Sequence, residues 1–62
     1  MMVFRVHYMT APAVPHVYCR VFVAPRINET FAAVGSLTMR KNDFESFRNR
    51  FDAEFIEEES GQ

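Results

Sequence analysis

The sequence predicts a small α+β domain, in which one amphipathic helix packs on one face of an antiparallel sheet of three strands, or four. Two observations carry this prediction. Residues 2–9, 16–24 and 30–40 are rich in apolar and aromatic residues and show period-two alternation, which is typical of strands. Residues 42–55 instead repeat phenylalanine at helical spacing, which indicates a helix with one apolar face.

The first two strands, residues 2–9 and 16–24, are joined by the segment TAPAVP, whose two prolines predict a wide, rigid turn. We expect the strands to pair antiparallel with Tyr8 opposite Val17, because this register collects apolar side chains on one face. A slip by one residue would mix the two faces. The other face then carries Val3, Arg5, His7, Tyr18, Arg20 and Phe22.

The third strand is expected over residues 30–40, after a turn at residues 25–29. Alternation would put Ala33 and Gly35 on the apolar face, where two small residues leave a shallow trough for the aromatic rings of the helix. The competing interpretation is a short helix over residues 28–35, since glycine favours helix C-termini. The full apolar face of this strand would be Phe31, Ala33, Gly35, Leu37 and Met39.

The helix is expected to begin at Asn42, a favourable N-cap residue, with Glu45 at the capping-box position three residues later. At about 100° per residue, four phenylalanines fall within an arc of roughly 80°. This stripe would anchor the helix on the sheet. Its members are Phe44, Phe47, Phe51 and Phe55.

Two ends of the helix are compatible with the sequence. The helix can run to about Glu58, or it can end near Asp52 and be followed by a short edge strand at residues 53–58. We favour the second, because the adjacent Phe55 and Ile56 would then point to opposite faces. Glutamates on an edge strand also discourage further pairing.

The length and the cysteine content limit the number of domains and the kinds of stabilising cross-link that the chain can have. Sixty-two residues form at most one domain, expected over residues 1–59 with a frayed tail at 60–62. Cys19 is the only cysteine, which precludes an intrachain disulfide, and we expect it to be a small core residue. With His7 and His16 it offers too few ligands for a zinc site, so we expect no metal and no cofactor. Self-association as a homodimer is one remaining source of stability.

Membrane insertion and secretion are not expected. Arg5 and His7 interrupt the first apolar stretch, and no stretch approaches the roughly 18 apolar residues of a membrane span. The sequence therefore predicts a cytoplasmic protein without a membrane partner.

The net charge of −1 conceals an asymmetry between the two parts of the chain. Residues 1–41 carry five basic side chains and one acidic side chain (+5 − 1 = +4), whereas residues 42–62 carry two basic and seven acidic ones (+2 − 7 = −5). Such an acidic end can imitate a phosphate backbone and occupy the nucleic-acid groove of another protein. The alternative is a solvated tail. The candidate partner-binding residues are Asp52, Glu54, Glu57, Glu58 and Glu59.

The polar sheet face offers a second candidate site. It mixes cations with aromatic rings, as single-strand nucleic-acid platforms do. In the expected register Arg5 lies opposite Arg20, and their repulsion would be relieved by a nearby anion. That anion could be a nucleic acid, the protein's own acidic end or a partner. The residues of this alternative site are Arg5, His7, Tyr18, Arg20 and Phe22.

The strand-to-helix segment GSLTMRKNDFESF and the acidic end AEFIEEE resemble, in general build, the small inhibitor proteins that bacteriophages encode. The anti-CRISPR proteins are the best-known class of these. The resemblance implies a non-enzymatic protein that binds a host protein or ribonucleoprotein complex in the host cytoplasm, by steric or DNA-mimic occlusion and without direct contact to nucleic acid. A nucleic-acid-binding module and a structural subunit of a larger assembly are the alternatives. The sequence shows no catalytic motif, so no catalytic residue is expected.

Overall fold

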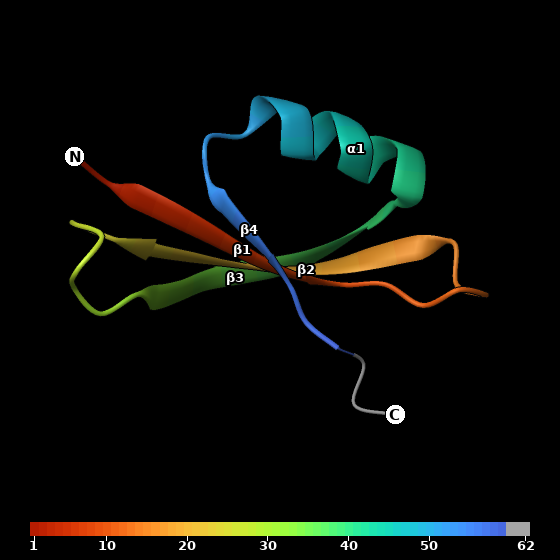
Figure 1. Ribbon diagram of the computed structural model, residues 1–62, viewed down its shortest axis with the longest axis horizontal. Coiled ribbons are helices and arrows are strands. Elements are labelled where there is room, and N and C mark those ends of the chain that lie inside the picture. Colours follow the sequence, from red (N-terminus) through yellow and green to blue (C-terminus); the bar gives the residue numbers. More distant parts are fainter. Residues whose placement is uncertain (60–62) are drawn as a thin grey trace.

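The computed structural model describes residues 1–59, which form a four-stranded sheet with one helix lying against it (Figure 1). The α+β class, the third strand and the end of the helix before a short fourth strand are thereby confirmed. The expected frayed tail, residues 60–62, lies outside the described residues. The elements are β1 (Val3–Met9), β2 (His16–Ala24), β3 (Ala32–Arg40), α1 (Lys41–Arg50) and β4 (Glu54–Glu57).

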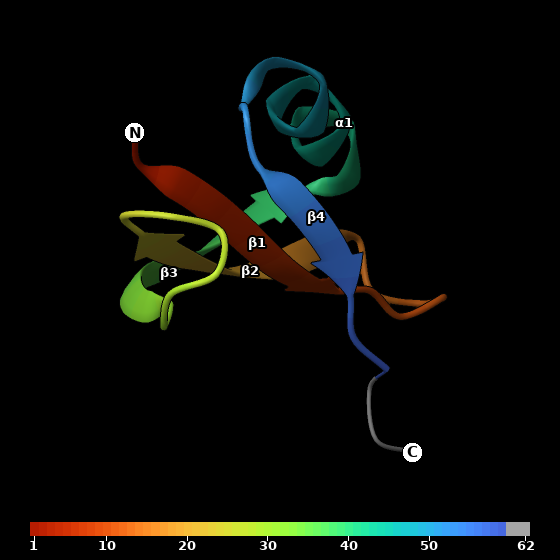
Figure 2. The same cartoon turned by 60° about the vertical axis from the view of Figure 1, so that its left-hand side comes forward.

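The sheet has the strand order β3-β2-β1-β4. The pairs β1–β2 and β2–β3 are antiparallel as expected, whereas β4 runs parallel to β1, so the four-stranded sheet is mixed and not wholly antiparallel. The reason is the path of the chain: α1 carries it from β3 at one edge to β4 at the opposite edge. Figures 1 and 2 show the helix on one side of the sheet and β4 beside β1.

The register of β1 and β2 differs from the expected one by two residues. Tyr8 lies opposite Cys19 instead of Val17, and Arg5 lies opposite Phe22 instead of Arg20. A shift by two keeps every side chain on its face, so the period-two pattern predicted the faces correctly but could not choose between these registers. The expected Arg–Arg repulsion across the strands is therefore wrong.

The shallow trough expected at Ala33 and Gly35 is not formed, because β3 contains a bulge. Gly35 pairs with Val21 and Ala33 pairs with Phe22, so that Val34 has no partner in β2. The extra residue reverses the alternation, and Ala33 lies on the face opposite to that of Gly35. A Cβ placed on Gly35 would have no neighbour within 4 Å, so no aromatic ring of the helix fills this position.

The helix begins at Lys41, and its N-cap lies two residues before the expected one at Asn42. Arg40 is the N-cap residue and makes no side-chain capping hydrogen bond, so the capping box predicted at Asn42 is not formed. The strand instead runs directly into the helix, and the backbone N–H of Lys41 donates to the carbonyl oxygen of Pro15 at 3.1 Å. The Nε of Arg40 donates to Oδ2 of Asp43 at 3.2 Å across the first turn.

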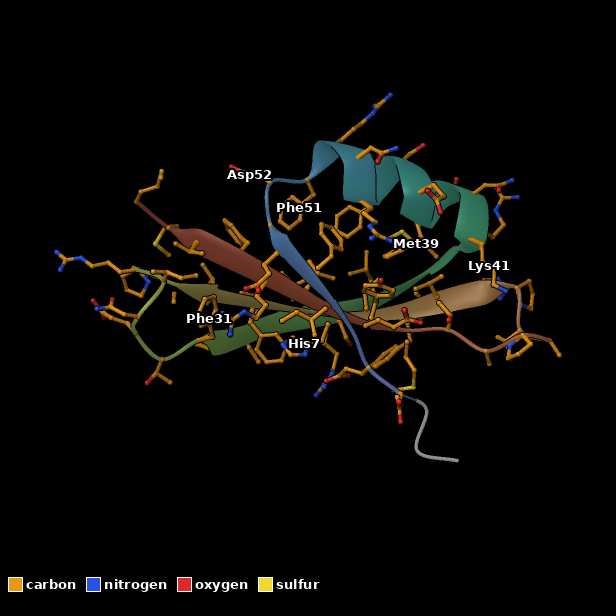
Figure 3. All side chains as sticks on the ribbon, viewed as in Figure 1. His7, Phe31, Met39, Lys41, Phe51 and Asp52 are labelled. Carbon is orange, nitrogen blue, oxygen red and sulfur yellow. The ribbon has the colours of Figure 1, made fainter. Side chains whose placement is uncertain are left out.

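The core lies between the helix and the sheet. The ring of Phe44 is 4.7 Å from that of Tyr8 and 6.0 Å from that of Phe55. Phe47 stacks on Phe51 at 5.1 Å and meets Phe55 edge-on at 5.6 Å. Figure 3 shows Phe51 in the layer between helix and sheet. The predicted stripe thus forms one cluster, although Phe55 reaches it from β4. The buried members of the core are Val6, Tyr8, Val17, Cys19 and Phe44.

Candidate functional site on the outer sheet face

The sheet face opposite the helix, which we call the outer face, carries a cluster of ion pairs. Nη2 of Arg20 donates to both carboxylate oxygens of Glu58 at 2.8 Å, and Nδ1 of His7 lies 3.0 Å from Oε2 of Glu58. Nε of Arg5 donates to Oε1 of Glu54 at 2.9 Å. The two arginine–glutamate ion pairs and the His7–Glu58 hydrogen-bond contact fasten the acidic end onto β1 and β2. We call these five residues the ion-pair cluster: Arg5, His7, Arg20, Glu54 and Glu58.

Glu58 occupies the centre of this cluster. Its hydrogen bond from Arg20 lowers the pKa of the Glu58 carboxyl, His7 adds to the effect, and partial desolvation opposes it. The carboxylate is therefore ionised at neutral pH. The backbone N–H of Glu58 also donates to the carbonyl oxygen of Tyr8 at 2.8 Å, which extends the β1–β4 ladder beyond Glu57.

Aromatic rings cover the cations of the outer face. The Arg5 guanidinium lies 4.0 Å from the ring centroid of Phe31, and the Arg20 guanidinium lies 5.6 Å from that of Phe22. Phe22 also meets the His7 ring edge-on at 5.0 Å. In Figure 3 His7 lies on the side of the sheet away from the helix. The rings therefore pack against cations of the same chain.

Phe31 belongs to this site although the sequence pattern placed it on the apolar face. The bulge at Val34 reverses the alternation in the first part of β3 and brings Phe31 to Arg5. A signal was present in Gly35, because a glycine inside a strand pattern is typical of a bulge.

The structure brings together four of the five residues of the predicted nucleic-acid face. Tyr18 is the exception: it lies beside the β1–β2 loop, 43% exposed. There it lines an apolar hollow of about 210 Å³ together with Val14, His16 and Thr38. The guanidinium groups of Arg5 and Arg20 are already bound by carboxylates of the protein. A phosphate backbone would have to displace those carboxylates before it could bind.

The acidic end divides into two sets of carboxylates. Glu54 and Glu58 are held in the ion-pair cluster. Asp52, Glu57 and Glu59 are exposed and form no salt bridge among residues 1–59, although the hydroxyl of Thr10 donates to Glu57 at 3.3 Å. We call Asp52, Glu57 and Glu59 the free carboxylates.

Three further possibilities are a reactive cysteine, a metal site and a membrane-spanning helix. Cys19 is fully buried in the core, as expected, and burial raises the pKa of its thiol, which disfavours the reactive thiolate. Within residues 1–59 no three His, Cys, Asp or Glu side chains are placed to hold a metal ion. In the same range no helix has the length and apolar character needed to cross a membrane.

Comparison with known proteins yields no matching family model, no matching curated protein and no matching solved structure.

Proposed function

We propose that the protein is a non-enzymatic inhibitor that binds a host protein or ribonucleoprotein complex through its acidic end. The observation that carries this proposal is that the acidic end is attached to the sheet, because Glu54–Glu57 form β4 and Glu58 is bound by Arg20. Glu54 and Glu58 are fixed by Arg5 and Arg20 at 2.8–2.9 Å, so the free carboxylates lie in or directly beside a segment that is attached to the sheet.

The free carboxylates suit a basic protein surface that normally binds nucleic acid. Such surfaces present Lys and Arg side chains to phosphates, and a fixed group of carboxylates can occupy the same cations. Binding to an ordered strand also costs less conformational entropy than ordering a flexible tail. The proposal places this binding in the cytoplasm of the host cell and includes no direct contact with nucleic acid.

The structure separates the carboxylates that are held in ion pairs from those that are free, and this separation allows a direct test of charge mimicry. A test variant removes the three free carboxylates and keeps the ion-pair cluster: Asp52→Asn, Glu57→Gln and Glu59→Gln. A matched control removes the same amount of charge elsewhere on the surface: Glu29→Gln, Asp43→Asn and Glu45→Gln.

Each tagged variant is used as bait in a bacterial lysate, and a captured complex is then challenged with a nucleic-acid duplex. The duplex should compete with the wild-type protein, and the test variant should lose at least about tenfold in affinity, the equivalent of about 1.4 kcal/mol. The control should bind like wild type. Equal binding of both variants would contradict the proposal. A gel shift of nucleic acid by the protein alone, weakening steeply with salt, would favour the nucleic-acid-binding alternative.

A further inference from the structure

Strand β3 ends the sheet on one side, where only β2 is hydrogen-bonded to it. Eight of its nine residues are exposed, and only Met39 is partly buried. Among residues 1–59, therefore, no strand forms hydrogen bonds with the backbone N–H and C=O groups on the outer edge of β3. Such an edge is a template for pairing with another strand.

β3 lacks the charges and the proline by which natural edge strands avoid association, although it has one bulge near its beginning. Residues 32–39, AAVGSLTM, contain no charged residue and no proline. The bulge at Val34 interrupts the strand near its beginning, but residues 35–39 pair with β2 without irregularity. This segment, GSLTM, is a regular and uncharged length of open edge.

The GSLTM segment is complementary to itself when two copies pair antiparallel about Leu37. In that register Leu37 faces Leu37 of the second copy, Gly35 faces Met39, and Ser36 faces Thr38. Because a Cβ on Gly35 would have no neighbour within 4 Å, this position leaves room for the opposing methionine. Apolar pairs and hydroxyl pairs across strands are both favourable.

Charge also selects this pairing over the alternatives. In the Leu37-centred register Arg40 falls opposite Val34 of the second copy, so no like charges meet. The other sheet edge, β4, carries glutamates and would repel a second copy of itself. Of the two edges, only β3 can meet its own copy without opposing like charges.

We infer that two copies of this chain pair through β3, antiparallel and centred on Leu37, to form one continuous eight-stranded sheet. The two-fold axis stands perpendicular to the sheet, so both helices lie on the same face. The Leu37 side chain, which is 41% exposed, then becomes covered by its copy. Chains of this length bury a small core, and the dimer supplies additional buried area.

The test uses a charge placed on the two-fold axis. In sedimentation equilibrium the wild-type chain of 7.2 kDa should show twice that mass at concentrations of about 100 µM, in the range of moderate self-association. Leu37→Lys and Leu37→Glu should each sediment as a monomer, because like charges then face each other. An equimolar mixture of the two variants should recover the dimer. Ile27→Lys is the matched control: Ile27 is apolar and 62% exposed but lies outside β3, so its variant should remain dimeric.

Recovery of the dimer on mixing distinguishes lost pairing from lost folding, since an unfolded variant has no edge to recover. Circular dichroism of each variant checks the fold directly. A monomeric wild-type protein, a dimer that survives Leu37→Lys, or a failure of the mixture to dimerise would each overturn the inference. If the wild-type protein is monomeric and pairs through β3 only with another protein, the β3 edge is a binding site for that partner and the dimer inference is wrong.

Discussion

The two edges of the sheet are constructed in opposite ways. β4 and the residues that follow it carry four glutamates within residues 54–59, whereas residues 32–39 of β3 carry no charge. Both edge strands expose backbone groups, yet only β4 has the charges that deter a further strand. Two of these glutamates, Glu54 and Glu58, also bind cations of the outer face, so they attach β4 to the sheet as well as placing negative charge at its edge. β4 therefore has the charges of an edge that ends a sheet, whereas the uncharged β3 can accept a further strand.

The largest difference between the edges should appear when an apolar side chain is truncated on each. Phe55 of β4 packs against Phe44 and Phe47, whereas Val34 of β3 is 62% exposed. We expect Phe55→Ala to cost about 3 kcal/mol in the free energy of unfolding, and Val34→Ala to cost less than about 0.5 kcal/mol. Urea denaturation of both variants measures this. Equal losses would contradict the assignment of β4 to the core.

A smaller effect is expected from the ion pairs that fix the acidic end. Arg20→Ala removes both hydrogen bonds to Glu58 and should lower Tm by about 2–5 °C, the range for a partly exposed pair in a chain of this size. Arg26→Ala is the matched control, since Arg26 reaches Glu29 only at 4.0 Å on an exposed turn. Its melting curve should match wild type. If Arg20→Ala also melts like wild type, the ion-pair cluster does not hold β4.

The smallest effect is a dependence of stability on acid pH. The pKa of Glu58 is lower in the folded state than in the unfolded chain, so on acidification the unfolded state takes up the proton first. Stability from this group is therefore fully present above the ordinary glutamate pKa of about 4.3 and is lost as pH falls through the lower folded pKa. Between pH 7 and pH 3 the melting temperature should decrease less for Glu58→Gln than for wild type. Glu29→Gln should leave the wild-type slope unchanged.

Local patterns in the sequence were sufficient to predict the helix and the strands, and to predict which side chains of β1 and β2 share a face. Period-two alternation distinguishes one face from the other, and the phenylalanine spacing identified the helix and its buried stripe. The register of β1 against β2 could not be predicted from the sequence, because a shift of two residues leaves every side chain on its face. The bulge at Val34 was not predictable from period-two alternation, which assumes a regular strand, and it reverses the faces of Phe31 and Ala33. The start of the helix depends on a contact between Lys41 and Pro15, 26 residues apart (41 − 15), which no local capping rule contains.

The candidate site was predicted as two separate surfaces, and the structure joins them. The sequence indicated that the arginines of the outer face need an anion and that the protein's own acidic end was one candidate. It could not show that Glu54 and Glu58 meet those arginines, because this depends on β4 pairing beside β1. The division of the carboxylates into held and free sets follows from that pairing alone.

The parallel pairing of β1 with β4 has a consequence for how the molecule is made. Arg5 and Glu54, which meet in this pair, are 49 residues apart in the sequence. Antiparallel neighbours can form as soon as their connecting turn leaves the ribosome, but β1 must wait until the helix and β4 have both been synthesised. Contacts of such high sequence separation close slowly, because loop entropy is lost before they form. During synthesis β1 is therefore an exposed edge, and completion of the sheet is a late step of folding.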